Sequence, residues 1–175
     1  MDNTTTPNIK ALERGPWASR GLAQTALAPV RAHLQDWADW PIARQAAWVQ
    51  HIVLCVGREI LPHALRAYGL DQEADRCAQA QTLADIEAAA GALASQSPDL
   101  GNIHHYDVAT AVAWAAHWAQ RDALLRAVWH AAMAANSAVW AVRTAPNGSA
   151  ADGHALLVQA CQIWARDPAS FTPTA

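Results

Sequence analysis

Apolar residues recur three and four positions apart along most of this 175-residue chain, which is the spacing of α-helices that bury one face. Two of these stripes are especially regular. One follows Pro41 and consists of Ile42, Ala46, Val49, Val53, Val56 and Ile60. The other follows Asp122 and consists of Leu125, Val128, Ala132, Ala135, Val139 and Val142. The stripes predict two long helices whose apolar faces lie in the core.

The segment from Asp107 to Thr144 contains no proline or glycine and is almost entirely apolar. As a single helix it would be about 57 Å long, whereas a compact chain of this size has a radius of gyration of about 16 Å. We therefore predict two helices that meet at Gln120-Arg121-Asp122, with Asp122 as the N-cap of the second. The apolar face of the first consists of Val108, Val112, Ala115 and Ala119.

Prolines and glycines mark the predicted boundaries in the N-terminal half of the chain. A short helix is expected over residues 17–27, and a second segment should start at Pro29, because proline fits a first helical turn, and end at Trp40-Pro41. Pro62 should kink the helix that follows, since it lacks a backbone N–H. Gly69 should end that helix in the left-handed conformation.

The next helical region is predicted over residues 72–95, with Asp71 as its cap. Thr82 and Asp85 have the spacing of a capping box, which indicates a break near residue 81. Residues 97–106 are expected to form a loop, with Asp107 capping the following helix. A turn at 146–149 precedes the last helix, over residues 151–166.

No stretch of convincing length alternates in the way a β-strand does. The predicted architecture is therefore all-α, a single-domain compact bundle of about six helices. The helical domain is expected to span residues 16–167, between a flexible N-terminal tail at 1–15 and a C-terminal tail at 168–175.

Composition excludes several classes of protein. The net charge is −3 and Lys10 is the only lysine, so there is no concentrated basic patch for nucleic acid. No apolar run is long enough to predict a membrane span, and the first ten residues lack the order of a secretory signal. Cys55, Cys77 and Cys161 are odd in number and lie in apolar helical contexts, so we expect reduced, buried thiols and a cytoplasmic location.

Histidine is frequent, which makes metal binding the first chemistry to consider. The candidate ligands are His63, His104, His105 and His117. The chain lacks the Glu-x-x-His and His-x-x-x-His spacings typical of helical metal sites, so no metal or other cofactor is predicted.

Covalent catalysis is not favoured either. Cys55 follows His51 by one helical turn, but apolar neighbours surround it, whereas a reactive thiolate needs an exposed and electropositive setting. No Gly-x-Ser-x-Gly elbow or phosphate loop occurs, and Glu87 beside Asp85 is expected on a solvated face. The chain is therefore predicted not to be an enzyme.

Two histidines lie within the Asp107–Thr144 segment. Each follows a stripe residue by two positions, which turns it about 200° away from the apolar stripe. Counted from a corner at Arg121, they are not level with each other, so a shared metal is not expected. The face opposite the stripes carries a candidate partner-binding surface, which consists of Trp114, His117, Arg121, Arg126 and His130.

These features resemble a known family. Leu61-Pro62 closes an apolar helix that contains Cys55 and Glu59, and the segments ADIEA at 84–88, AAHWAQRD at 115–122 and RAVWHAA at 126–132 follow. In this order, between Trp48 and Val142, they resemble the Ala-rich all-helical immunity proteins of bacterial toxin–immunity systems. The resemblance implies a cytoplasmic, non-catalytic protein that neutralises a cognate toxin by binding it.

Two other functions are open. One is a helical bundle, metal-binding or enzymatic, that uses the histidines named above. The other is a small-ligand-binding domain whose cavity is lined by Trp48, Trp114, Trp129 and Trp140. The apolar stripes of the Pro41 and Asp122 helices could also pack against a second copy, which would make the protein a homodimer.

Overall fold

The computed structural model describes Pro7 and residues 20–95, 103–146 and 148–166. The predicted tails therefore lie outside the described residues, apart from Pro7. The helices are α2 (Arg20–His33), α3 (Ile42–Cys55), α4 (Leu61–Ala67), α5 (Asp71–Ala78), α6 (Leu83–Ala94), α7 (Ile103–Ala119), α8 (Leu124–Thr144) and α9 (Ala150–Trp164). A short 3₁₀ helix, η1, covers Trp37–Asp39, and a π-helical turn, η2, covers Val56–Ile60.

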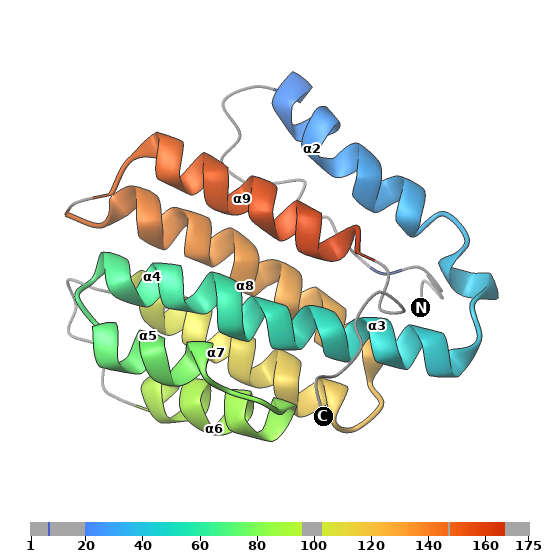
Figure 1. Cartoon of the computed structure of the whole chain (residues 1–175), viewed down its shortest axis with the longest axis horizontal. Coiled ribbons are helices and arrows are strands. Elements are labelled where there is room, and N and C mark those ends of the chain that lie inside the picture. The colour runs from blue at the N-terminus through green and yellow to red at the C-terminus, as the bar shows by residue number, and fades with distance from the viewer. Residues whose placement is uncertain (1–6, 8–19, 96–102, 147, 167–175) are drawn as a thin grey trace.

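The all-helical bundle is confirmed, since the described part of the chain contains no strand. The π turn joins α3 and α4 into one rod, so these residues form seven helices. In Figure 1, α8 lies next to α7, α9 and the α3–α4 rod, while α6 lies beyond α7 and α2 lies along the outer side of α9. No helix of the described residues is long and apolar enough to cross a membrane.

The disturbance predicted at Pro62 takes the form of the π turn. The N–H of Leu61 donates to the carbonyl of Val56, five residues earlier. This wider turn ends at Ile60, two residues before the proline, whose missing N–H and bulky ring disturb a regular α-helical ladder. At the end of α4, Gly69 has φ +75° and the N–H of Leu70 donates to the carbonyl of Leu65, which confirms the predicted glycine C-cap.

The predicted capping box at the start of α6 is also confirmed. The Thr82 hydroxyl accepts from the Asp85 N–H at 3.2 Å, and the Asp85 carboxylate accepts from the Thr82 N–H at 2.8 Å. The break between α5 and α6 is therefore fixed by local hydrogen bonds. Ser149 caps α9 in a related way by accepting from the N–H of Asp152.

The three aspartates predicted as N-caps do not cap helices. Asp71 is the first residue of α5, after Leu70, and Asp107 is inside α7, which begins four residues earlier than expected. The break at Gln120-Arg121-Asp122 is confirmed, but Asp122 has φ +55° and ends α7, while Ala123 precedes α8. The N–H of Ala123 donates to the carbonyl of Trp118, so the corner is a left-handed C-cap with aspartate in the usual glycine position.

The prediction that a new segment starts at Pro29 is wrong. One helix, α2, continues through this proline to His33. Proline removes only one donor from the helical ladder, and the apolar face around it includes Leu27, Val30 and Leu34, all buried. Burial of these side chains offsets the lost hydrogen bond.

The predicted stripes lie in the core except at the starts of two helices, and Ala46 is half-buried. Val49, Val53, Val56 and Ile60 are buried in the α3–α4 rod, as are five of the six stripe residues of α8. Ile42 is 72% exposed and Leu125 is 42% exposed, because both lie at the starts of their helices, where fewer neighbours cover the stripe. The three cysteines are buried and free, as predicted.

Seven of the tryptophans in the described part of the chain divide into two groups, and an eighth, Trp118, is half-buried on α7. Trp37, Trp40, Trp48 and Trp164 form a buried cluster, with ring centroids 4.9 Å apart for Trp37–Trp48 and 5.8 Å apart for Trp48–Trp164. Core filling is therefore the role of this group. The indoles of the second group are substantially exposed on α7 and α8, and they belong to Trp114, Trp129 and Trp140.

Candidate functional site

An aromatic face covers the outer side of the α7–α8 hairpin. We use this name for Trp114, His117, Trp118, Trp129 and His130. The Trp114 ring lies 5.9 Å from Trp118 and 5.2 Å from His117 on its own helix, and 6.3 Å from His130 on α8. Trp129 contacts His130 at 4.9 Å. The five rings therefore form one continuous surface that joins the two helices.

Trp114 and His130 are level because of where the corner lies. α7 ends at Ala119 and α8 begins at Leu124, so these two residues are five and six positions from their helix ends. His117 is closer to the corner, and its ring contacts the Trp114 ring from the same helix. The two histidines lie at different levels, as predicted, but a single indole, that of Trp114, contacts both of them.

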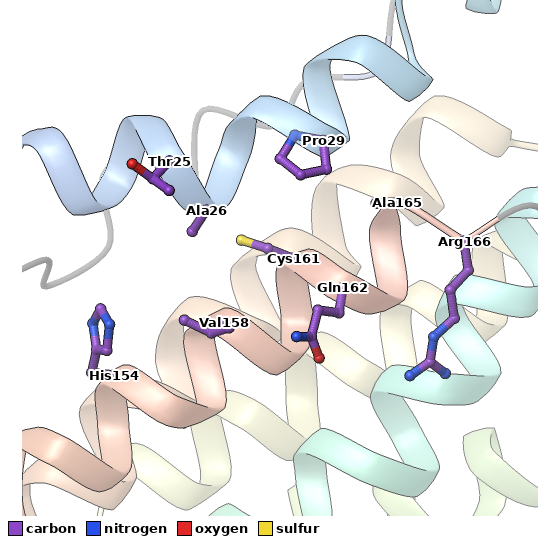
Figure 2. A pocket seen from close by; sticks show the side chains of 9 residues that line it. All are labelled: Thr25, Ala26, Pro29, His154, Val158, Cys161, Gln162, Ala165 and Arg166. Atoms are coloured by element: carbon purple, nitrogen blue, oxygen red, sulfur yellow. The ribbon is translucent and has the colours of Figure 1, made fainter.

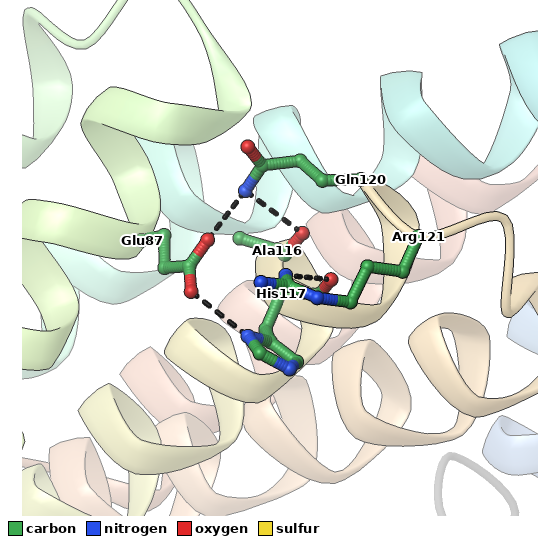
Figure 3. Close-up of polar contacts among 5 residues, drawn as sticks. All are labelled: Glu87, Ala116, His117, Gln120 and Arg121. Carbon is green, nitrogen blue, oxygen red and sulfur yellow. Dashed lines mark hydrogen bonds and ion pairs between the residues drawn. The ribbon is translucent and has the colours of Figure 1, made fainter.

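His117 is held by Glu87 of the neighbouring helix α6, and Gln120 at the end of α7 holds Glu87 in turn (Figure 3). Its Nδ1 lies 3.0 Å from the Glu87 Oε1 of α6, and the Gln120 amide donates to the other oxygen of the same carboxylate. Since an ionised carboxylate only accepts, Nδ1 carries the proton and Nε2 is left as an acceptor in the neutral ring. Glu87, expected on a solvated face, instead joins α6 to α7 and fixes the His117 ring.

Two arginines accompany the aromatic face. The Arg126 guanidinium lies 4.7 Å from the centroid of the Trp118 ring, a cation–π contact. Arg121 donates from Nη1 to the His117 carbonyl at 3.0 Å, so it also caps the end of α7. Burial lowers the pKa of His130, which keeps this ring neutral at neutral pH. The structure thus brings together all five residues of the predicted partner-binding surface.

Sequence reasoning missed three members of this region, namely Trp118, Trp129 and Glu87. Trp118 follows Trp114 by four residues, which is one helical turn, so spacing alone could have added it. Trp129 was expected to line a cavity. The contact from Glu87 joins positions 30 residues apart in the chain and has no local signal.

Cys55 and His51 do form a pair, but its electrostatics oppose nucleophilic chemistry. The Cys55 sulfur lies 3.7 Å from the His51 ring nitrogens. Burial, followed by the neighbouring Glu59 carboxylate, raises the pKa of the thiol to about 12. Arg166 forms an ion pair with Glu59 at 3.7 Å, so this group is a salt-linked patch between the α3–α4 rod and the end of α9.

The metal candidates are dispersed. His63 is exposed on α4, whereas His105 is buried on α7 between Tyr68 and Tyr106, at centroid distances of 5.1 and 4.2 Å. His104 is on the same helix as His105, and His117 pairs with Glu87. Among the residues whose placement is described, no three His, Cys, Asp or Glu side chains are close enough to hold a metal ion.

The predicted cavity lined by four tryptophans is not present. Trp48 is fully buried in the core, while Trp114, Trp129 and Trp140 are 45%, 41% and 42% exposed on the hairpin. A groove of about 590 Å³ does occur elsewhere, between α2 and α9. Figure 2 shows Ala26, Pro29, Val158 and Cys161 along it, with His154 and Arg166 toward its two ends.

Comparison of the chain with protein-family models, with curated proteins and with solved structures finds no match.

Proposed function

We propose that this chain is a non-catalytic binding protein that recognises another protein through the aromatic face and its two arginines. The observation that carries the proposal is the exposed Trp114 ring, which lies level with the half-buried His130 across the hairpin, together with Arg121 and Arg126 near the corner. Tryptophan and arginine are the residues most enriched among binding hot spots. Large apolar rings that remain in water on a monomer are better explained by a partner than by folding.

The chemistry of the site favours binding over catalysis. Its histidines are held by structural contacts, His117 by Glu87 and His130 by stacking against Trp114. The surface is rigid because it lies on two packed helices and not on loops, so little conformational entropy is lost when a partner docks. Its two arginines and its aromatic rings suit a partner surface with carboxylates beside an apolar patch.

The resemblance to immunity proteins supports a bacterial toxin as the protein partner. The protein would act in the cytoplasm and neutralise a cognate toxin by covering or distorting its active site. Such a protein requires no catalytic group and no cofactor of its own, which agrees with a surface built from stacked rings and arginines.

The experiment is co-expression of the chain with the toxin-domain protein encoded beside its gene, followed by affinity purification and a growth assay. We expect the wild-type chain to retain the toxin and to restore growth. Trp114→Ala and Arg126→Ala should each weaken binding by about tenfold or more, the loss typical of interface anchors.

Ile42→Ala is the matched control, because Ile42 is an exposed apolar residue of α3 outside this face. Each variant is first compared with the wild type by circular dichroism and thermal unfolding. If the folded Trp114 and Arg126 variants bind the toxin as tightly as the Ile42 variant does, the face is not the binding site. If the wild type neither binds the toxin nor restores growth, the immunity function is wrong.

The groove between α2 and α9 favours a second candidate function, the binding of a small, largely apolar molecule. Its volume of about 590 Å³ is within the usual range for ligand sites of about 300–1,000 Å³. Val158→Trp would fill the groove and abolish binding of a fluorescent fatty-acid analogue. Binding of that probe unchanged by the substitution would exclude the groove as its site.

A further inference from the structure

The outer side of α8 carries a stripe of its own, in which each residue follows a residue of the apolar stripe by one position, a turn of about 100°. Its members follow at intervals of three, four, three, four and three, and they are Arg126, Trp129, Met133, Asn136, Trp140 and Arg143. Trp129 and Trp140 are 41% and 42% exposed, and Met133 is partly exposed between them. This is the spacing of the seam at which one helix packs against another.

The four outer positions of the stripe read the same in both directions, and only the central pair, Met133 and Asn136, differs in residue type. Arginine stands at each end, tryptophan follows on each side, and Met133 and Asn136 flank the centre, which is between residues 134 and 135. When two copies of such a helix lie antiparallel, each position faces its mirror position. Trp129 of one copy then faces Trp140 of the other, and Met133 faces Asn136. A two-fold axis requires this kind of self-complementary surface.

We propose that the protein forms a homodimer in which the outer stripes of two α8 helices pack antiparallel about a two-fold axis. The dimer surface shares Arg126 and Trp129 with the proposed partner-binding surface, so a second copy and a toxin would compete for it, but the dimer is inferred from the stripe of α8 and not from Trp114 or Arg121. Four indoles, two from each copy, leave water at the centre of the interface. Asn136 provides the single polar position of the central seam, a feature that fixes orientation and register in helical pairs.

The available area is sufficient for a stable dimer. α8 has 21 residues and is therefore about 32 Å long. Together with the adjacent surface of α7, a strip about 20 Å wide gives about 640 Å² for each copy, or about 1,300 Å² in total, which is within the range of specific interfaces.

The charges of the stripe give the dimer a distinctive salt dependence. Arg126 of one copy faces Arg143 of the other at each end of the seam, about 13 Å from the axis. Both guanidiniums stack on indoles of their own chain, Arg126 on Trp118 at 4.7 Å and Arg143 on Trp140 at 5.2 Å. They lie at the solvated rim, where added salt screens their repulsion. Dimerisation should therefore tighten with salt, whereas binding of an acidic partner should weaken.

The test is sedimentation equilibrium of the purified full-length chain over a concentration series, at low and at moderate salt. We expect a monomer–dimer equilibrium with a lower dissociation constant at moderate salt. Trp140→Glu should raise the dissociation constant by about tenfold or more, since it places a charge opposite Trp129 in a desolvated seam. Ile42→Glu adds the same charge to an exposed residue of α3 and should leave the dimer unchanged.

Orientation is tested by crosslinking with a short bismaleimide. Arg126→Cys and Arg143→Cys chains should crosslink when mixed, because these positions face each other. Neither chain should crosslink with itself, because like positions would be about 26 Å apart along the helix. The native thiols are buried, and burial raises their pKa to about 11 or 12, so the wild type serves as the unreactive control.

A wild-type chain that remains monomeric at every concentration would overturn the proposal. A dimer that Trp140→Glu and Ile42→Glu affect equally, or that crosslinks through like positions, would also overturn it. These measurements use the purified chain without a toxin, so a failed dimer leaves the toxin-binding proposal to be decided separately by the Trp114 variant.

Discussion

Gly57 provides a sharp test of how tightly the centre of the bundle is packed. It is buried in the π turn between α3 and α4, directly against Ile86 of α6. A methyl group added at Gly57 would lie 2.6 Å from Cδ1, 2.8 Å from Cγ2 and 3.0 Å from Cγ1 of that isoleucine. The end of the side chain could move, but Cγ2 is attached directly to the Cβ of a β-branched residue, whose rotamer in a helix is nearly fixed.

Two effects of Gly57→Ala oppose each other. Alanine is favoured over glycine in a helix by about 1 kcal/mol, whereas overpacking a core costs about 1–3 kcal/mol. Because the contact involves three carbon atoms, we expect the clash to exceed the propensity gain and to lower the free energy of unfolding by about 1–2 kcal/mol. For a chain of this length the melting temperature should fall by about 2–8 °C.

Gly91→Ala is the control, since a methyl group at this position of α6 meets no atom within 4 Å. It should raise the free energy of unfolding by about 0.5–1 kcal/mol, through propensity alone. The measurement is urea unfolding followed by circular dichroism. Ile86→Ala removes all three clashing atoms, so Gly57→Ala should become neutral or stabilising in that background. If Gly57→Ala stabilises the wild type as much as Gly91→Ala does, the close contact is not real.

Three further predictions concern the corner, a cap and pH. Asp122→Val should lower the free energy of unfolding by about 1–2 kcal/mol, because a β-branched residue is strained at φ +55°. Asp122→Gly should leave that free energy unchanged. Equal urea midpoints for the two variants would refute the left-handed corner. Thr82→Ala removes the capping box and should lower the free energy of unfolding by about 1 kcal/mol. An unchanged urea midpoint would contradict a stabilising role for this cap. Burial lowers the pKa of His51 and His105, so the unfolded chain takes up protons first. The free energy of unfolding should be constant above pH 6.5, the ordinary histidine pKa, and should decrease as the pH falls from there toward the lower pKa values of these histidines in the folded chain. A free energy of unfolding that does not change between pH 7.5 and pH 5 would contradict this.

Local signals in the sequence predicted the helices and most of their buried faces. Helical spacing of apolar residues identifies the stripe of Val49 to Ile60, and the left-handed end at Gly69 follows from glycine's conformational freedom. The capping box at Thr82 is also a pattern of four consecutive residues. Each of these depends on residues within one or two turns, which is why they can be predicted without knowledge of the fold.

The errors arose where tertiary packing overrides a local rule. Pro29 usually starts a helix, but burial of Leu27, Val30 and Leu34 against the bundle keeps α2 continuous through it. Aspartate is a common N-cap residue, which led to the prediction for Asp122. The corner instead needs a residue that tolerates a positive φ, and aspartate also meets that requirement. The contact of Glu87 with His117 depends on how α6 packs on α7, which no local pattern encodes.

The position of the exposed tryptophans follows from the small residues on the inner side of the hairpin. The buried faces of α7 and α8 consist largely of alanine, including Ala116, Ala127 and Ala131, so the two helices can approach closely. A close-packed seam of methyl groups leaves no space for an indole. The tryptophans of these helices must therefore lie outside, whereas Trp48 and Trp164 fill the wider space where α3 and α9 meet. Folding alone would be satisfied by polar residues at the outer positions. Because they are tryptophans flanked by arginines, the outer surface of the hairpin is where a partner, or a second copy, gains binding energy.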